Sequence, residues 1–181
     1  MLAQKYNNIQ ISKRISYLLR HNPENLRMDS NGWVSVDDLL KKLNISFELL
    51  SHIVETNDKK RFSFNEFFTF IRANQGHTLD IDLELKETIP PNILYHGTSK
   101  IFVESILKAG ISKMQRQYVH LSSDKATAYR VGKRRSRISN PIILEINAEQ
   151  MYKDGHKFYL SENGVWLTDF VPIKYLSNLA S

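Results

Sequence analysis

The chain has 181 residues, of which 41% are hydrophobic, so it can form one domain or two small domains with packed cores. It has no cysteine, which excludes disulfides, thiolate nucleophiles and thiolate metal sites, and its six histidines show no HExxH spacing. We therefore expect no metal. The formal net charge of +6 and the sequence pI near 9.4 favour anionic partners, nucleic acid first among them.

The N-terminal segment and the hydropathy of the chain bear on where in the cell we expect the protein. The first twenty residues lack the continuous apolar core of a signal peptide, and no later run is long enough to span a bilayer. We therefore expect an intracellular, cytoplasmic protein that contacts no membrane.

Helical patterns open the first half of the chain. From Ile11, apolar residues at i, i+4, i+7 and i+8 predict a helix that is buried on one face and stops by Pro23. A turn and short strand are expected in residues 30–36, followed by a short helix over 37–44 with acidic residues in its first turn. Ser46 is the expected cap of the next helix. Its predicted buried stripe is Phe47, Leu50, Ile53 and Val54.

Residues 61–76 are rich in phenylalanine and partly alternating, which predicts a β-hairpin. Helices followed by a hairpin are typical of a winged-helix module. Residues 78–92 lose their aromatic side chains and end in a double proline, as a linker does. We therefore predict two domains, 1–91 and 92–181.

The second half alternates short strands with helices. Gly110 should close the first of these helices, and Ser123 or Asp124 should start the second. Asn163 and Gly164 should turn a hairpin. The predicted strands are 93–99, 118–123 and 141–148, the helices 101–110 and 125–134, and the hairpin 157–168.

Four basic residues are candidates for chemistry: Arg20, His21, Arg72 and Arg134. Arg20 and His21 adjoin at a helix end, where the helix dipole favours cations, so a solvated end is the alternative. Arg72 leads from a strand into a polar turn, and Arg134 lies in a basic run, so surface positions would explain them too. Together, however, three arginines and a histidine suit a phosphate monoester, whose oxygens guanidinium groups bind bidentately.

Two strand ends form a second candidate site. His96 at a strand end is expected to donate a hydrogen bond to a ribose hydroxyl, while Gly97 allows close backbone approach. His120 adds a second histidine on another predicted strand. The alternative is a turn with a satisfied histidine. The small polar residues of these segments are Thr98, Ser99 and Ser122.

Seven segments occur along the chain in the following order: LLRHNP, NGWVSVDDLL, IRANQGH, YHGTS, VHLSSD, VGKR and NGVWLTDFVPIKYL. In this order they resemble the Tpt1/KptA family of RNA 2′-phosphotransferases, from about Ile11 to Leu176. The resemblance implies an α+β protein with an N-terminal winged-helix, RNA-binding lobe. It also implies a C-terminal lobe with the ADP-ribosyltransferase fold that binds NAD, and an active site in the cleft between the lobes.

The resemblance further implies a reaction that removes an internal 2′-phosphate from RNA and consumes NAD as a co-substrate. The 2′-phosphate attacks the anomeric carbon of the nicotinamide ribose and releases nicotinamide. The 2″-hydroxyl of the attached ADP-ribose then attacks the phosphate, giving 2′-OH RNA and ADP-ribose 1″,2″-cyclic phosphate. Family members include enzymes that finish tRNA splicing, so tRNA processing is an expected role. We expect the chain to act as a monomer.

By motif, the essential residues of the family fall on Arg20, His21, Arg72 and Arg134. The arginines should bind the phosphate and stabilise the second transition state, and His21 should serve proton transfer to the departing RNA oxygen. A signature of the NAD lobe maps to His96, His120 and Val165. The implied NAD-binding residues are His96, Gly97, Thr98, Ser99, His120, Ser122 and Val165.

The sequence departs from the family pattern in three places. Tyr118 and Phe170 stand where histidine is common, and residues 134–141 form a longer, more basic segment. These departures leave open how Arg134 fits the site.

Two other functions stay open. A non-catalytic winged-helix nucleic-acid binder would explain the first half and the charge, but not the second half. An ADP-ribosyltransferase acting on nucleic-acid ends or protein would use the same NAD lobe and keep ADP-ribose on its acceptor. A slow second step would instead let ADP-ribosylated RNA accumulate.

Overall fold

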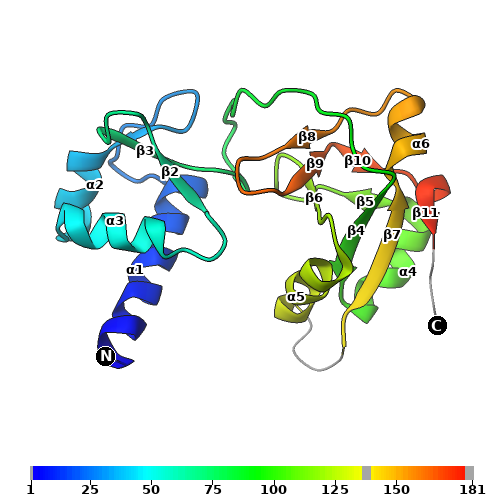
Figure 1. The fold of residues 1–181 in the computed structure, drawn as a ribbon, viewed down its shortest axis with the longest axis horizontal. Coiled ribbons are helices and arrows are strands. Elements are labelled where there is room, and N and C mark those ends of the chain that lie inside the picture. The colour runs from blue at the N-terminus through cyan, green and yellow to red at the C-terminus, as the bar shows by residue number, and fades with distance from the viewer. Residues whose placement is uncertain (1, 136–139, 178–181) are drawn as a thin grey trace. The chain divides into compact units, whose positions relative to one another are not determined.

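The computed structural model describes residues 2–135 and 140–177. The chain divides into two compact units, Met1–Glu84 and Leu85–Ser181. Both units combine helices with small antiparallel sheets, so the predicted α+β class is confirmed (Figure 1). Among the described residues, every helix falls short of the length and apolar character that crossing a bilayer requires.

The boundary between the units lies at Glu84 rather than at residue 91. The Thr88 amide donates to the Phe158 carbonyl at 2.8 Å, and Glu87 forms an antiparallel bridge with Tyr159. These contacts tie the last part of the predicted linker to the second unit.

The first unit contains the predicted helices and hairpin. Its elements are α1 (Leu2–Arg20), β1 (Val34–Ser35), α2 (Val36–Leu43), α3 (Phe47–Glu55), β2 (Phe62–Phe64) and β3 (Phe70–Ala73). Strand β3 lies between β1 and β2, antiparallel to both. The fully buried side chains of α1 are Ile15, Leu18 and Leu19, so its predicted apolar face is confirmed.

Helix α3 differs from its prediction at one end. The Ser46 hydroxyl accepts from the Leu49 amide at 3.3 Å, which confirms the cap, and Leu50 and Ile53 are buried. Phe47, however, is 38% exposed, so its predicted burial is wrong. Its ring lies 6.0 Å from that of Phe64 because the first turn of α3 faces the hairpin rather than the core.

The second unit contains the remaining elements. These are β4 (Ile93–Thr98), α4 (Lys100–Ala109), β5 (Ile111–Ser112), β6 (Val119–Leu121), α5 (Lys125–Arg135), β7 (Ile142–Asn147), α6 (Ala148–Lys153), β8 (Tyr159–Leu160), β9 (Trp166–Thr168), β10 (Phe170–Val171), the 3₁₀ helix η1 (Ile173–Tyr175) and β11 (Leu176–Ser177). The predicted strands, helices and hairpin are all present. The additional elements are too short to give a periodic signal.

Two antiparallel sheets organise this unit. One has the strand order β11, β7, β4, and the other has β6, β9, β8. They meet where Tyr95 of β4 exchanges two backbone hydrogen bonds with Ser122, of 2.9 and 2.8 Å. The long β4–β7 pair forms the core through Leu94, Leu144 and Ile146, all fully buried. Strands β4 and β6 are therefore held side by side, and the predicted histidines lie within them rather than at a strand end as we expected for His96.

Helix α5 packs directly on β4, as Figure 1 shows. A Cβ atom added to Gly97 would lie 1.9 Å from the Ala128 carbonyl oxygen and 3.0 Å from the Gly132 nitrogen. The close approach that glycine allows here is therefore that of the α5 backbone. The Asp124 carboxylate accepts from the Thr127 amide at 2.7 Å, which confirms the predicted start of this helix.

Candidate active site

Arg20 and His21 lie at the C-terminal end of α1, as predicted. Arg20 is the last residue of the helix, and the His21 amide donates to the Tyr17 carbonyl at 2.9 Å, which continues its last turn. Because Leu18 and Leu19 are fully buried, the backbone that carries the two cationic side chains is held by the core. The two residues therefore project from a rigid support.

The segment Gly76–Thr78, after β3, fastens this helix end. The Thr78 amide donates to the Arg20 carbonyl at 3.0 Å, and the Thr78 hydroxyl oxygen lies 3.2 Å from His21 Nδ1. A Cβ atom on Gly76 would lie 3.8 Å from Arg20 Cζ, and the φ of Gly76 is +89°. The guanidinium of Arg20 thus lies along a glycine backbone in the left-handed region.

Arg72 belongs to β3 and stacks on an indole ring. Its Cζ atom lies 4.4 Å from the centroid of the Trp33 ring, and its Nη1 atom lies 3.8 Å from Glu84 Oε2. The Trp33 amide in turn donates to the Asp29 carboxylate at 2.8 Å. The Arg72 side chain is only 12% exposed, so its guanidinium is held in one place.

His77 is a buried neighbour of the candidate site that sequence reasoning did not single out, although it belongs to the IRANQGH segment. It is 1% exposed, and within the described residues neither ring nitrogen has a hydrogen-bond partner. Burial, followed by the charges of Arg20, His21 and Arg72, lowers the pKa of His77 from 6.5 to about 4. His77 is therefore neutral at physiological pH and lies within reach of three predicted site residues.

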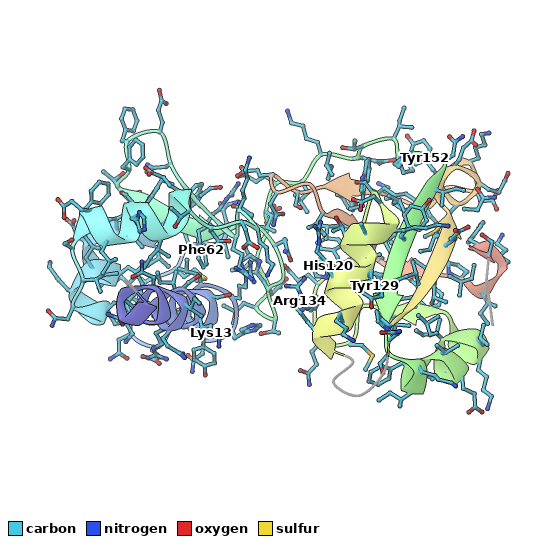
Figure 2. The ribbon with its side chains drawn as sticks, turned by 60° about the horizontal axis from the view of Figure 1, so that its bottom comes forward. Lys13, Phe62, His120, Tyr129, Arg134 and Tyr152 are labelled. Atoms are coloured by element: carbon cyan, nitrogen blue, oxygen red, sulfur yellow. The ribbon has the colours of Figure 1, made fainter. Side chains whose placement is uncertain are left out.

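The first unit thus brings together Arg20, His21 and Arg72, as the resemblance implies. Rigid guanidinium groups around a neutral buried ring form a site for an anion with several oxygens. The fourth predicted residue, Arg134, is an exposed residue of α5 in the second unit (Figure 2). Residues 136–139 of the longer basic segment lie outside the described residues.

The second unit joins the two predicted histidines. His96 Nδ1 lies 3.1 Å from the His120 carbonyl oxygen. Because a carbonyl only accepts, Nδ1 carries the proton, and Nε2 of the neutral ring is an acceptor. The predicted hydrogen bond from His96 to a ribose hydroxyl stays a prediction.

His120 has the opposite tautomer. Arg116, a residue that sequence reasoning missed, places Nη1 2.9 Å from His120 Nδ1. A guanidinium only donates, so His120 Nδ1 accepts and its neutral ring keeps the proton on the buried Nε2. Arg116 therefore orients the ring of His120, whose carbonyl orients His96.

The remaining predicted NAD-binding residues lie near these strands. Thr98 and Ser99, at the end of β4, are each 5% exposed, and Ser122 pairs with β4 through its backbone. Val165 immediately precedes β9, and its amide donates to the Ser161 hydroxyl at 3.1 Å. Since β9 pairs with β6, the three signature positions lie on neighbouring strands.

Two of the three departures from the family pattern, Tyr118 and Phe170, make packing contacts. The Tyr118 ring lies 5.5 Å from the Tyr159 ring, and the Phe170 ring lies close to Gly110. Over the part of the chain that the structure describes, no three His, Asp or Glu residues gather as metal ligands would.

Comparison with known proteins gives consistent matches over nearly the whole chain. Residues 6–170 match the family described as RNA 2′-phosphotransferase, Tpt1/KptA family. A probable RNA 2′-phosphotransferase of Fusobacterium nucleatum subsp. nucleatum is 53% identical over 177 residues, covering 94% of this chain and 98% of that protein. Those of Flavobacterium johnsoniae and Acaryochloris marina are 53% and 45% identical, covering 92% and 91% of this chain and 93% of each protein. On these matches, the chain belongs to the Tpt1/KptA family of RNA 2′-phosphotransferases.

Proposed function

We propose that this protein is an NAD-dependent RNA 2′-phosphotransferase that removes an internal 2′-phosphate from RNA. The observation that carries the proposal is the convergence of Arg20, His21 and Arg72 around the neutral His77. A 2′-phosphate monoester carries nearly two negative charges at neutral pH, and it matches the charge and forked donors of two arginines.

The arginines have to overcome an unfavourable dipole. The C-terminal end of α1 carries partial negative charge, which disfavours an anion beside Arg20. The Thr78 amide binds the Arg20 carbonyl, and Arg20 and Arg72 add full positive charges, so the balance favours a phosphate. As charge builds on the phosphate oxygens during transfer, the same fixed guanidinium groups stabilise it without reorganising. His21 would move a proton to the departing RNA 2′-oxygen.

The donor set of the second unit fits NAD as a substrate. His96 Nε2 can accept from a ribose hydroxyl, and the exposed Arg116 beside His120 supplies the positive charge that a pyrophosphate needs. NAD supplies the ADP-ribosyl group, with nicotinamide as its leaving group, and ends as ADP-ribose 1″,2″-cyclic phosphate. The proposal therefore needs groups from both units, Arg134 included.

The element orders support the folds that the proposal requires. Three helices and the β2–β3 hairpin of the first unit suit a winged-helix RNA-binding lobe. The two sheets of the second unit suit an ADP-ribosyltransferase lobe. Residues 1–84 hold eleven basic and eleven acidic side chains, whereas 85–181 hold fourteen and eight, so the whole excess of +6 belongs to the second unit. We expect long-range attraction of RNA to come mainly from that unit.

The proposal is tested with an RNA oligonucleotide that carries one internal 2′-phosphate, incubated with and without NAD. Nicotinamide release and the phosphate status of the RNA are both followed. Arg72→Ala should lower kcat/KM by about 10²–10³-fold, as expected for losing a fixed donor to a developing charge. Arg72→Lys keeps the positive charge but loses the forked pair of donors, so its kcat/KM should lie between those of the wild type and Arg72→Ala. Arg27→Ala removes an exposed arginine of the same unit and should leave activity unchanged.

The outcomes separate the competing functions. Folded protein that neither releases nicotinamide nor converts the RNA would contradict the proposal and favour a binding module. Adenine label from NAD retained on the RNA would indicate an ADP-ribosyltransferase or a slow second step. A chase with unlabelled NAD separates those two, because only a slow intermediate goes on to 2′-OH RNA.

A further inference from the structure

Thr78 makes three contacts with the end of α1, from 57 and 58 residues away in the sequence. Its amide donates to the Arg20 carbonyl at 3.0 Å. Its hydroxyl oxygen lies 3.4 Å from the same carbonyl and 3.2 Å from His21 Nδ1. Only one arrangement of protons makes all three contacts hydrogen bonds at the same time.

The direction of each hydrogen bond follows from the chemistry of the atoms. The Arg20 carbonyl can only accept, so the single proton of the Thr78 hydroxyl points toward it. The hydroxyl oxygen is then an acceptor toward His21, whose Nδ1 must carry the proton. The neutral His21 ring therefore presents Nε2 as its basic nitrogen.

We propose that Thr78 is a positioning residue that holds the proton of His21 on Nδ1 and so makes Nε2 the nitrogen that exchanges protons with the substrate. A histidine side chain free in water prefers the proton on Nε2, so Thr78 reverses the intrinsic preference. The hydroxyl acts on His21 as the third group of a catalytic triad acts on its histidine, by fixing both tautomer and orientation. The catalytic consequence rests on the proposed function, whereas the tautomer does not.

The segment that carries Thr78 is anchored on both sides. His77 is 1% exposed, and Asn74 is 5% exposed with its side-chain amide donating to the Lys60 carbonyl at 2.8 Å. The Asn74 amide also donates to the Arg61 carbonyl at 2.9 Å. On the helix side, the His21 ring lies 6.1 Å from the Tyr17 ring in a tilted contact. These contacts fix the backbone that carries Thr78, while the side chains of Thr78 and His21 are themselves exposed.

The test compares the wild type with Thr78→Val, which has nearly the same shape without the hydroxyl, and with Thr78→Ser, which keeps it. Long-range ¹H–¹⁵N correlation spectra of labelled protein at alkaline pH report which ring nitrogen of His21 carries the proton. A His21→Gln variant assigns the signals. We expect the proton on Nδ1 in the wild type and in Thr78→Ser, and a shift toward Nε2 in Thr78→Val.

Turnover supplies the second readout. We expect Thr78→Val to lower kcat for release of 2′-OH RNA by about 10–100-fold, because proton transfer by a positioned side chain contributes at least that much. In Thr78→Val the KM for the RNA should change less than about threefold, and Thr78→Ser should retain most of the wild-type kcat. General damage to the fold would instead lower kcat and raise KM in both variants. Circular dichroism checks that each variant is folded.

A wild-type His21 with its proton on Nε2 would overturn the proposal whatever the activity. An unchanged tautomer in folded Thr78→Val would overturn it equally, as would full turnover by that variant. If the wild type shows no RNA phosphotransfer at all, the proposed function fails while the tautomer measurement still decides the role of Thr78.

Discussion

Replacing His77 with phenylalanine should make the first unit less sensitive to acid than it is in the wild type. The folded protein resists protonation of His77 because the ring is buried and faces Arg20, His21 and Arg72. Its pKa is about 4 in the folded protein against 6.5 for an unperturbed histidine. Between these values the unfolded chain binds more protons, so the free energy of unfolding falls as the pH falls.

The size of the effect follows from the two pKa values. A group with a pKa of 6.5 when unfolded and about 4 when folded costs about 2 kcal/mol of stability at pH 5 and about 3 kcal/mol at pH 4. At pH 7.5 the cost is close to zero, because the ring is neutral in both states. Phenylalanine has a ring of similar size and no proton to gain, so this part of the pH dependence should disappear.

The assay is urea unfolding at pH 7.5 and pH 5, followed by tryptophan fluorescence. The chain has two tryptophans, Trp33 in the first unit and Trp166 in the second, so a Trp166→Phe background reports on the first unit alone. The loss of stability between the two pH values should be about 2 kcal/mol smaller with His77→Phe. His52→Phe, a change at an exposed histidine of α3, should leave the loss unchanged.

An equal loss of stability with and without His77 would refute the reasoning, since another group would then carry the acid sensitivity. A larger loss in the phenylalanine variant would contradict the sign of the effect. The absolute stability at pH 7.5 decides nothing, because phenylalanine can change packing and removes two buried nitrogens at the same time.

Two further predictions concern the second unit. Gly97→Ala should unfold or severely destabilise it, by more than about 3 kcal/mol, because the new Cβ atom would lie 1.9 Å from the Ala128 carbonyl oxygen and two backbones would have to separate. Trp166 fluorescence measures this loss. In the comparison variant Gly155→Ala the added atom meets nothing within 4 Å, so only the φ of +92° opposes alanine and the cost should be about 1–2 kcal/mol. Asp124→Ala should remove the cap of α5 at a cost of about 1 kcal/mol, visible as faster amide exchange at Thr127, whereas Asp124→Asn should keep most of the protection.

The long elements were predictable because their patterns repeat. Helix α1 shows its buried face in sequence, and the β2–β3 hairpin shows strand-forming residues on both sides of the turn at residues 65–69. The exposure of Phe47 was not predictable, because helical periodicity places a residue on a face of the helix without saying whether the core or the hairpin covers the first turn of that helix. Strands of two residues, such as β5, have no period to detect.

The site was predictable only in part, and for different reasons. The resemblance placed Arg20, His21 and Arg72 together, whereas the residues alone favoured a solvated helix end for Arg20 and His21. The burial of His77 depends on packing between the end of α1 and the exit of β3, which no local pattern records. The proton positions on His96 likewise depend on strand pairing, because its partner is a backbone carbonyl.

The division of charge between the units limits what each can do for RNA. The tip of the β2–β3 hairpin carries Glu66 and the exposed rings of Phe67 and Phe68, so it lacks the basic side chains that would grip a phosphate backbone. The cations of the first unit act instead as a local site, stacked on Trp33 and tied to Gly76–Thr78. Under the proposed function, such a local site would recognise one phosphate by geometry, and the excess charge of the second unit would attract the RNA at a distance. Raising the salt concentration should therefore weaken RNA capture more than it weakens recognition of the 2′-phosphate.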